Sequence, residues 1–261
     1  MIPGDSMTHT GAVAVLDALG FKGIWKSWSP VNVLHKLEDV LERTAWFPEE
    51  KLLSGQVDHL RQERRLCFLS DTIVVASSIT PSPYVETTPS MQAGYDLDAL
   101  FDVSNAVAGL QKWMLTSSIG PPLAYRGAIA FGEYLIRDPF IIGPAVDEAA
   151  EGEKLAEGAL VWFCPSALRQ FENALRFPAP GFPRPGRDFP VKHPWAVPLK
   201  SGQRFNTAVV RPDGSNDELL VQLAAAFRID AEPTRAEVIV KFENTRDFLI
   251  GSTDAAPLRR P

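Results

Sequence analysis

The segment LCFLSDTIVVAS, residues 66–77, constrains the fold more than any other part of this sequence. Two short apolar runs flank Ser70-Asp71, and this pattern predicts a β-hairpin whose turn is formed by those two residues. Helical patterns precede and follow the hairpin, at residues 29–41 and 96–117. A sheet that contains such a hairpin between helices is not purely parallel, so the sequence predicts an α+β fold.

The remaining elements are predicted from the spacing of apolar residues. A buried strand is expected over residues 12–19, a charged surface helix over 49–64 and a loop over 80–94. Further strands are expected at 123–131, 140–142, 159–163, 196–200 and 205–210, with a short helix at 146–156. Two more helices, separated near Pro233, are expected between residues 216 and 248.

Proline is concentrated late in the chain. Of the 22 prolines, six fall between Pro178 and Pro194. A helix does not persist at that density, because each proline removes a backbone hydrogen bond. We therefore expect a proline-rich insertion at about 177–195. It interrupts a main domain at 1–211, which a helical C-terminal extension at 212–261 follows.

Composition and charge exclude several functional classes. The chain has 26 Lys and Arg against 32 Asp and Glu, a net charge of −6, which argues against binding of nucleic acid through bulk positive charge. Two cysteines, Cys67 and Cys164, form neither a disulfide scaffold nor a Cys-rich zinc site. No apolar run approaches the roughly 20 residues that span a bilayer, and the first residues do not resemble a signal peptide. We expect a soluble, cytoplasmic protein that binds neither nucleic acid nor membrane.

Two aspartates occupy positions that suit a divalent metal. Asp17 stands at the end of the first predicted strand, and Asp71 stands in the hairpin turn. Two carboxylates at neighbouring strand ends can hold Mg²⁺ or Mn²⁺ against phosphate oxygens. The glycine-flanked segment 20–23 would offer free backbone N–H groups to a phosphate. The alternative is structural, because turn and strand-end aspartates also cap the backbone that follows them.

Four motifs occur in a fixed order along the chain: VLDALGF, LSDTIVVAS, YRGAIAFGE and IIGPAVDEAAEGEKL. Together they resemble the catalytic domain of class III nucleotidyl cyclases. That family reads roughly D-hydrophobic-x-G-F, then G-D, then R-x-G-I-x-x-G, then G-x-x-V-N-x-A-A-R-L. The likeness runs from about Ala12 to Phe163, and AVPLKSG extends it toward Val210. It implies a ferredoxin-like fold with a central, mostly antiparallel sheet flanked by helices.

The resemblance assigns roles to five residues. Asp17 and Asp71 would bind two Mg²⁺ or Mn²⁺ ions, with the Ala18 carbonyl as a further ligand. Arg126 would contact the terminal phosphates of a nucleoside triphosphate, unless it is an ordinary surface arginine. Lys200 would do the same from a partner subunit, unless it is an exposed strand-end lysine. The family's sites are shared across a head-to-tail homodimer, so a homodimer with active sites at its interface is implied.

One helix departs from the family pattern. The family has asparagine and, four residues later, arginine, where this chain has Asp147 and Glu151. Loss of an electrostatic group of this kind costs roughly 3–4 kcal/mol of transition-state stabilisation. Either the protein is inactive or another cation takes the arginine's place. Lys154, two helical turns after Asp147, is the candidate that we assign to catalysis, and Arg137 is a second.

The residues that select the base also depart from the family. The positions that distinguish ATP from GTP hold Cys67 and Phe140, which match neither purine pair and would be ordinary core residues in the alternative interpretation. Phe21 of the first motif completes the expected substrate pocket, and bulky Phe140 favours a smaller base.

A short cyclase domain of this kind resembles the pyrimidine cyclases of bacterial Pycsar antiphage systems. The implied reaction converts UTP to cyclic UMP, which activates a separate effector. Alternatives are a cytidylate cyclase, a purine cyclase with a divergent pocket, and a cyclase-like module that binds nucleotide without turnover.

Overall fold

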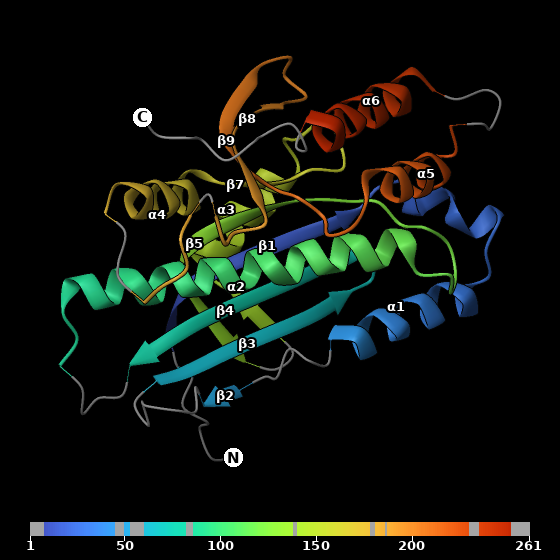
Figure 1. Cartoon of the computed structure of the whole chain (residues 1–261). Coiled ribbons are helices and arrows are strands. Elements are labelled where there is room, and N and C mark those ends of the chain that lie inside the picture. Colours follow the sequence, from blue (N-terminus) through green and yellow to red (C-terminus); the bar gives the residue numbers. More distant parts are fainter. Residues whose placement is uncertain are drawn as a thin grey trace.

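The computed structural model describes residues 8–44, 50–52, 60–81, 86–137, 140–177, 181–185, 187–229 and 235–251 (Figure 1). The strands in these ranges are β1 (Thr8–Ala18), β2 (Glu50–Leu52), β3 (Leu60–Leu69), β4 (Thr72–Pro81), β5 (Tyr125–Arg137), β6 (Phe140–Ile142), β7 (Val161–Phe163), β8 (Val191–Pro198) and β9 (Arg204–Val210). The helices are η1 (Phe21–Lys26), α1 (Pro30–Thr44), α2 (Pro89–Thr116), α3 (Pro144–Glu153), α4 (Pro165–Arg176), α5 (Asn216–Phe227) and α6 (Ala236–Gly251).

The strands form one sheet in the order β2-β3-β4-β1-β5-β7-β9-β8, and β6 pairs with β5 beside this path. Among the described strand pairs, only β5 and β7 run parallel. The elements β1, α1, β3, β4, α2 and β5 form a β-α-β-β-α-β unit, the ferredoxin-like arrangement. The predicted α+β fold with a mostly antiparallel sheet is therefore confirmed.

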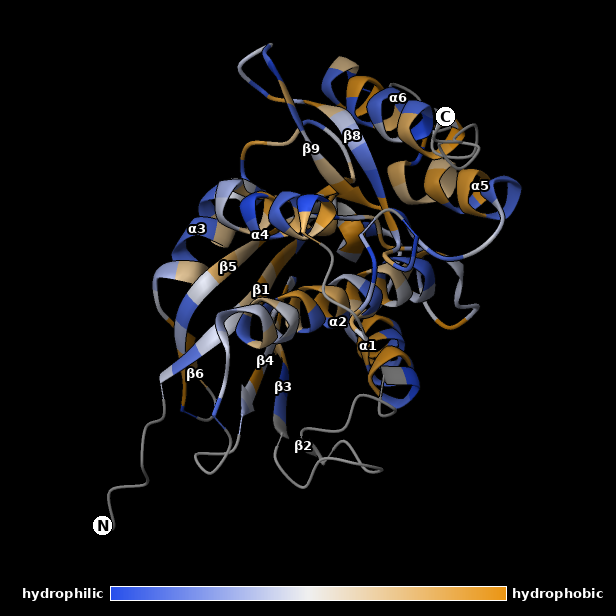
Figure 2. Cartoon of the chain, turned by 60° about the vertical axis from the view of Figure 1, so that its left-hand side comes forward, coloured by the Kyte–Doolittle hydropathy of each residue, from blue (hydrophilic) through white to orange (hydrophobic). Residues whose placement is uncertain are grey.

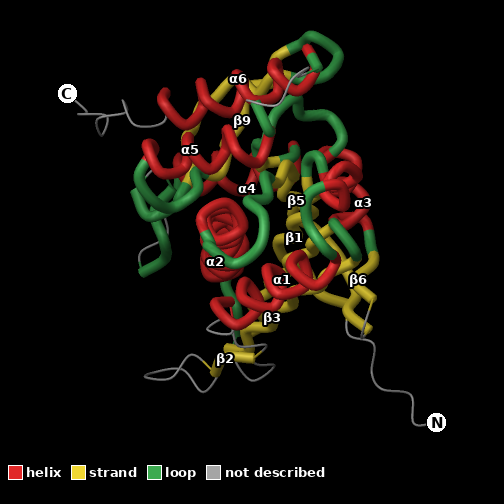
Figure 3. The backbone as a smooth tube through the Cα atoms, turned by 90° about the vertical axis from the view of Figure 1, so that its right-hand side faces the viewer, coloured by secondary structure: helices red, strands yellow, loops and turns green. Residues whose placement is uncertain are grey.

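Each face of the sheet has its own apolar core, because side chains alternate along a strand. Ala12, Ala14 and Leu16 of β1 belong to the first core, which also contains buried residues of α1, α2 and α4. Val13 and Val15 point to the second core, which contains buried residues of α3, α5 and α6. In Figure 3, α2 is seen end-on on one side of β1 and β5, and α3 lies on the other. Figure 2 shows that β1 is largely apolar, as a strand covered on both faces should be, whereas β5 carries polar residues toward β6.

The hairpin with its turn at Ser70-Asp71 is confirmed, and Ser70 adopts the left-handed conformation with φ of 61°. The helix expected over 49–64 is wrong: β2 ends at Leu52, and β3 starts at Leu60. The charges there suggested a solvated helix, but the strand uses them in tertiary contacts. Arg64 pairs with Asp102 of α2.

Two further predictions need correction. The loop expected over 80–94 is shorter, because β4 runs to Pro81 and α2 begins at Pro89. The hydroxyl of Thr88 accepts a hydrogen bond from the Met91 N–H (3.2 Å) and so caps α2. Helix α4 was not predicted. Pairing of β8 with β9 begins at Val191, inside the expected proline-rich insertion.

The two expected C-terminal helices are confirmed as α5 and α6. They bury Leu219, Leu223, Phe248 and Leu249 in the second core. The division of the chain at residue 211 stays a prediction. None of the described helices is both long and apolar enough to cross a membrane.

Candidate functional site

The two candidate metal ligands lie at adjoining strand ends. Asp17 is opposite Thr72 of β4 on one side and opposite Arg126 of β5 on the other. The Ala18 N–H donates a hydrogen bond to the Asp71 carbonyl oxygen (3.1 Å). The backbone that carries Asp17 is thus joined directly to the hairpin turn that carries Asp71. The strand register and the turn together bring the two predicted aspartates to one edge of the sheet.

Arg126 lies between two carboxylates. Its Nη2 donates to the Asp17 Oδ2 at 3.2 Å, and its Nε donates to the Glu153 Oε1 at 2.5 Å. The Arg126 side chain is 14% exposed, while those of Asp17 and Glu153 are 27% and 8% exposed. Glu153 ends α3, and sequence reasoning missed it. The pattern of that acidic helix did not distinguish a buried glutamate from its exposed neighbours.

Lys200 belongs to the same electrostatic group of its own chain. The role that the resemblance gives it, from a partner subunit, stays a prediction. It follows β8, and its N–H donates to the Leu155 carbonyl oxygen (3.0 Å), just beyond α3. Burial and then the nearby Arg126 lower the pKa of Lys200, while Glu153 opposes this shift. Burial raises the pKa of Glu153, which Arg126 opposes, and the neighbouring Asp17 raises it further. Two carboxylates and two cations therefore interact within one chain.

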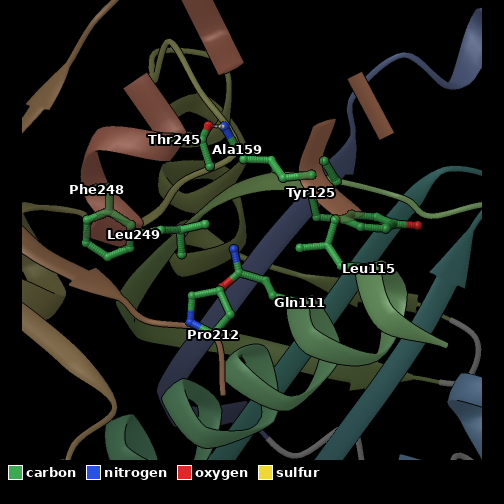
Figure 4. Close-up of a pocket in the computed structure, with 10 residues that line it drawn as sticks. Gln111, Leu115, Tyr125, Ala159, Pro212, Thr245, Phe248 and Leu249 are labelled. Carbon is green, nitrogen blue, oxygen red and sulfur yellow. Dashed lines mark hydrogen bonds between the residues drawn. The ribbon is translucent and has the colours of Figure 1, made fainter. Parts of the chain in front are cut away.

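Tyr125 adds an unpartnered polar atom near this site. The residue is 3% exposed, and within the described residues its hydroxyl has no hydrogen-bond partner. Burial, then the charges of Asp71 and Asp17, raise the pKa of Tyr125. Figure 4 shows the hydroxyl pointing away from Phe248 and Leu249. Sequence reasoning missed this residue too, although it directly precedes Arg126.

The cavity between Tyr125 and the C-terminal helices is not a nucleotide site. Its lining includes Gln111, Thr245 and Phe248 (Figure 4), and its volume is about 10 Å³. That is close to the space of one water molecule. The Gln111 Oε1 is buried and has no hydrogen-bond partner among the described residues, so one ordered water would suit it.

The donor set at this edge fits a hard divalent cation. Mg²⁺ is commonly held by one or two carboxylates and completes its shell with phosphate and water oxygens. Asp17 and Asp71 are both partly exposed and supply such carboxylates. Within the ranges that the structure describes, no group of three or more His, Cys, Asp or Glu residues is arranged to hold a metal. A site at Asp17 and Asp71 would therefore depend on oxygens from the substrate, the backbone or water.

The predicted base-reading residues do not meet within the chain. Cys67 lies on β3, and β4, β1 and β5 intervene before β6, which carries Phe140. The Phe140 side chain is 63% exposed, so the structure does not bear out the alternative that it is a core residue. Cys67 is partly buried against the second core. Phe21 begins η1, packs against the first core and makes an edge-to-face contact with Trp25 (5.3 Å between ring centroids).

The candidate residues of α3 are exposed, although Lys154 directly follows Glu153. Asp147 and Glu151 are exposed, and Lys154 is exposed at the C-terminal cap of the helix. Arg137 is exposed at the far end of β5, opposite Phe140. The chain by itself thus brings Asp17, Arg126 and Lys200 into one electrostatic group, which the turn with Asp71 adjoins. Lys200 is nevertheless exposed, as the alternative interpretation expected, and so are Lys154 and Arg137.

No protein-family model matches the chain, and no curated protein matches it. Several solved structures do. The guanylate cyclase domain of RhGC from Catenaria anguillulae, in complex with GTP, is 11% identical over 80% of this chain and 100% of that chain, with a TM-score of 0.48. The adenylyl cyclase CyaB from P. aeruginosa is 13% identical over 82% and 99%, with a TM-score of 0.44. The adenylate/guanylate cyclase/hydrolase from Silicibacter pomeroyi is 14% identical over 80% and 100%, with a TM-score of 0.41. At such identities and TM-scores, no substrate or activity transfers to this chain.

Proposed function

We propose that this protein is a nucleotidyl cyclase, which converts a nucleoside triphosphate to its 3′,5′-cyclic monophosphate and diphosphate. The observation that carries the proposal is the placement of Asp17 and Asp71 at adjoining strand ends, with Arg126 paired to Asp17 at 3.2 Å. The four ordered motifs of the sequence lead to the same residues. Carboxylates beside a partly buried arginine suit a substrate that carries phosphates and is bound together with metal ions.

The reaction forms one bond and breaks one. The ribose 3′-oxygen attacks the α-phosphorus and gives up its proton to solvent water. The bond between the α-phosphorus and the oxygen that bridges to the β-phosphorus breaks, and its electron pair leaves with diphosphate. Mg²⁺ or Mn²⁺, when bound, would supply positive charge at the attacking and leaving oxygens. Asp17 and Asp71, with the Ala18 carbonyl, would hold the ions. Arg126 and Lys200 would bind the β- and γ-phosphates and so orient the α-phosphorus for in-line attack.

The outward-facing residues of the predicted site would serve a second copy. Phe140, Asp147 and Lys154 are exposed in the single chain. In a head-to-tail homodimer, these residues would complete the partner's site, with Lys154 in place of the family's arginine. A monomer would then be inactive, and dilution below the dimer dissociation constant would abolish turnover.

We infer UTP as the substrate, and cyclic UMP as a second messenger for a separate effector in antiphage defence. The support is that Cys67 and Phe140 match neither purine-selecting pair, together with the resemblance to pyrimidine cyclases. A pyrimidine also needs less room than a purine beside a bulky side chain such as Phe140.

Incubation of the purified protein with each of the four nucleoside triphosphates and Mn²⁺, followed by mass spectrometry, tests both parts of the proposal. Cyclic UMP from UTP is the expected product. Cyclic AMP from ATP, with no product from UTP or CTP, would contradict the pyrimidine assignment and leave the cyclase assignment intact. No cyclic product from any triphosphate would contradict the cyclase assignment.

A second candidate is a cyclase-like module that binds nucleotide without turnover. The exposed acids Asp147 and Glu151 favour it, because they stand where the family has asparagine and the transition-state arginine. Calorimetry together with the product assay separates the candidates. A non-catalytic module would bind a triphosphate with Mn²⁺ in the calorimeter but would form no cyclic product.

A further inference from the structure

We propose that Glu153 is a positioning residue that acts through Arg126. It fixes one edge of the guanidinium, so that Asp17 stays available to a divalent cation and the other edge stays available to phosphate. This inference rests on the proposed function, because it concerns the same site. Glu153 lies within the fourth motif of the sequence, but beyond the ten positions of the family pattern, and the resemblance assigned it no role.

The geometry divides the guanidinium between two partners. Glu153 accepts the hydrogen bond of Nε at 2.5 Å, and Asp17 accepts one from Nη2 at 3.2 Å. An arginine carries five N–H groups, one on Nε and two on each Nη. In the part of the chain that the structure describes, no other group pairs with Arg126. Three N–H groups on the two Nη atoms therefore remain for a phosphate.

Burial makes the contact between Glu153 and Arg126 a strong constraint. The Glu153 residue as a whole is 6% exposed, and a buried charge is costly unless it is paired. Removal of one partner of such a pair leaves the other uncompensated, so the two side chains hold each other in place. The longer and more exposed contact to Asp17 is the one that a ligand can exchange at lower cost.

A glycine places Glu153 at this distance from the sheet. A Cβ on the preceding Gly152 would lie 2.6 Å from the Cys164 Sγ and 2.9 Å from the Ala128 Cβ, so only glycine permits this approach. The Trp162 Nε1–H donates to the Gly152 carbonyl oxygen (3.2 Å) and fixes the end of α3. The last turn of α3 is thus held against β5, the strand that carries Arg126.

The consequence concerns competition for Asp17. If Glu153 no longer held Nε, the guanidinium could donate from both Nε and Nη2 to the two oxygens of the Asp17 carboxylate, in the two-point geometry that arginine prefers. Arginine would then compete with the metal for the same oxygens. With Glu153 in place, Arg126 makes one contact to Asp17, and that contact yields to a divalent ion.

A charge-conserving test uses Glu153→Asp, which keeps the carboxylate but withdraws it by one methylene. Binding of Mn²⁺ to nucleotide-free protein is followed by electron paramagnetic resonance, which requires no turnover. We expect the Kd for Mn²⁺ to rise roughly tenfold or more, the usual effect of losing a group that orients a metal ligand. Glu133→Asp, an exposed position on β5, is the matched control and should bind as the wild type does.

A double-mutant cycle with Arg126→Lys shows whether the effect acts through the arginine, because all four proteins carry the same charge. Once lysine has replaced the guanidinium, Glu153→Asp should change the Kd by less than about twofold. Equal losses in both backgrounds would overturn the inference, as would unchanged Mn²⁺ binding in Glu153→Asp. If Glu153→Asp does not fold, Glu153→Gln replaces it in the same measurement. An unchanged Kd for Mn²⁺ in Glu153→Gln would also overturn the inference. A nucleotide-free wild type that binds no Mn²⁺ would also overturn the inference, whereas the proposed function is judged separately by the formation of cyclic product.

Discussion

Asp17 of β1 and Arg126 of β5 are opposite each other in the sheet, and the Arg126 Nη2 lies 3.2 Å from the Asp17 Oδ2. This cross-strand pair joins the first and third of the four sequence motifs. The hairpin turn with Asp71 adjoins it through the N–H of Ala18. The Asp17 side chain is 27% exposed, so its carboxylate can be reached by an ion from solvent, as a metal ligand must be.

Asp71→Asn should abolish most turnover. The amide keeps the size of the side chain but removes the negative charge that a divalent ion requires. We expect kcat to fall roughly 100-fold or more, the scale of losing one transition-state electrostatic group. Cyclic nucleotide formation with Mn²⁺ measures the effect, and Asp213→Asn, on an exposed loop, is the control. A non-catalytic module would lose little, so equal behaviour of the two variants would contradict a cyclase.

Lys154→Ala should lower kcat sharply if this lysine replaces the family's transition-state arginine in the partner's site. The expected loss is roughly 100-fold, with a smaller change in KM, because the charge acts at the transition state. Steady-state kinetics above the dimer dissociation constant give both constants. Unchanged turnover would remove Lys154 from the mechanism.

Lys200→Ala should instead raise KM for the triphosphate. Its charge lies with Arg126, Glu153 and Asp17 in the ground state of the protein, so it is placed to bind phosphate before reaction. We expect a roughly tenfold rise in KM, the size of about 1.4 kcal/mol of lost binding. A fall in kcat at unchanged KM would contradict this role and would indicate that Lys200, rather than Lys154, acts at the transition state.

Gly152→Ala should loosen the end of α3. The added methyl group would meet Cys164 and Ala128 below normal contact distances, and overpacking of this kind costs about 1–3 kcal/mol. Urea unfolding should show a lower midpoint with an unchanged slope. Because α3 carries Glu153, affinity for Mn²⁺ should fall as well. A variant as stable as the wild type would show that the helix can shift at no cost.

The burial of Lys36 leads us to predict that the free energy of unfolding depends on pH. Its side chain is buried in α1 and donates to the Ser117 carbonyl oxygen (2.9 Å). Burial lowers the pKa of Lys36 to about 8 from 10.5, which Asp39 opposes and Arg43 assists. Between these two values the unfolded chain holds a proton that the folded chain has released. The free energy of unfolding should therefore rise with pH in this window, relative to Lys36→Met.

Denaturant unfolding of both proteins at pH 7, 8, 9 and 10 measures this difference, and other titrating groups cancel in the comparison. A constant difference across the series would show that Lys36 titrates alike in both states.

Much of the central fold followed from local pattern. The apolar run before Asp17 and the two runs around Ser70-Asp71 predicted the strands and turn that carry both aspartates. These segments are buried on both faces or form a tight turn, so their spacing is fixed by the chain itself. The charged stretch at 49–64 was misinterpreted, because charges that contact distant partners have the same local pattern as charges in solvent. Arg64 meets Asp102 across 38 positions of sequence.

The sequence by itself determined the α+β class and the hairpin. It also contained the ordered motifs, from which Asp17, Asp71 and Arg126 were predicted as site residues. Only the tertiary structure decided that Glu153 is the buried partner of Arg126, that Lys200 joins the same group, and that Phe140 and Lys154 face outward. The physical reason is that burial and charge pairing arise between segments distant in sequence. A glutamate on an acidic helix becomes part of a site only when a glycine lets that helix approach an arginine on the sheet.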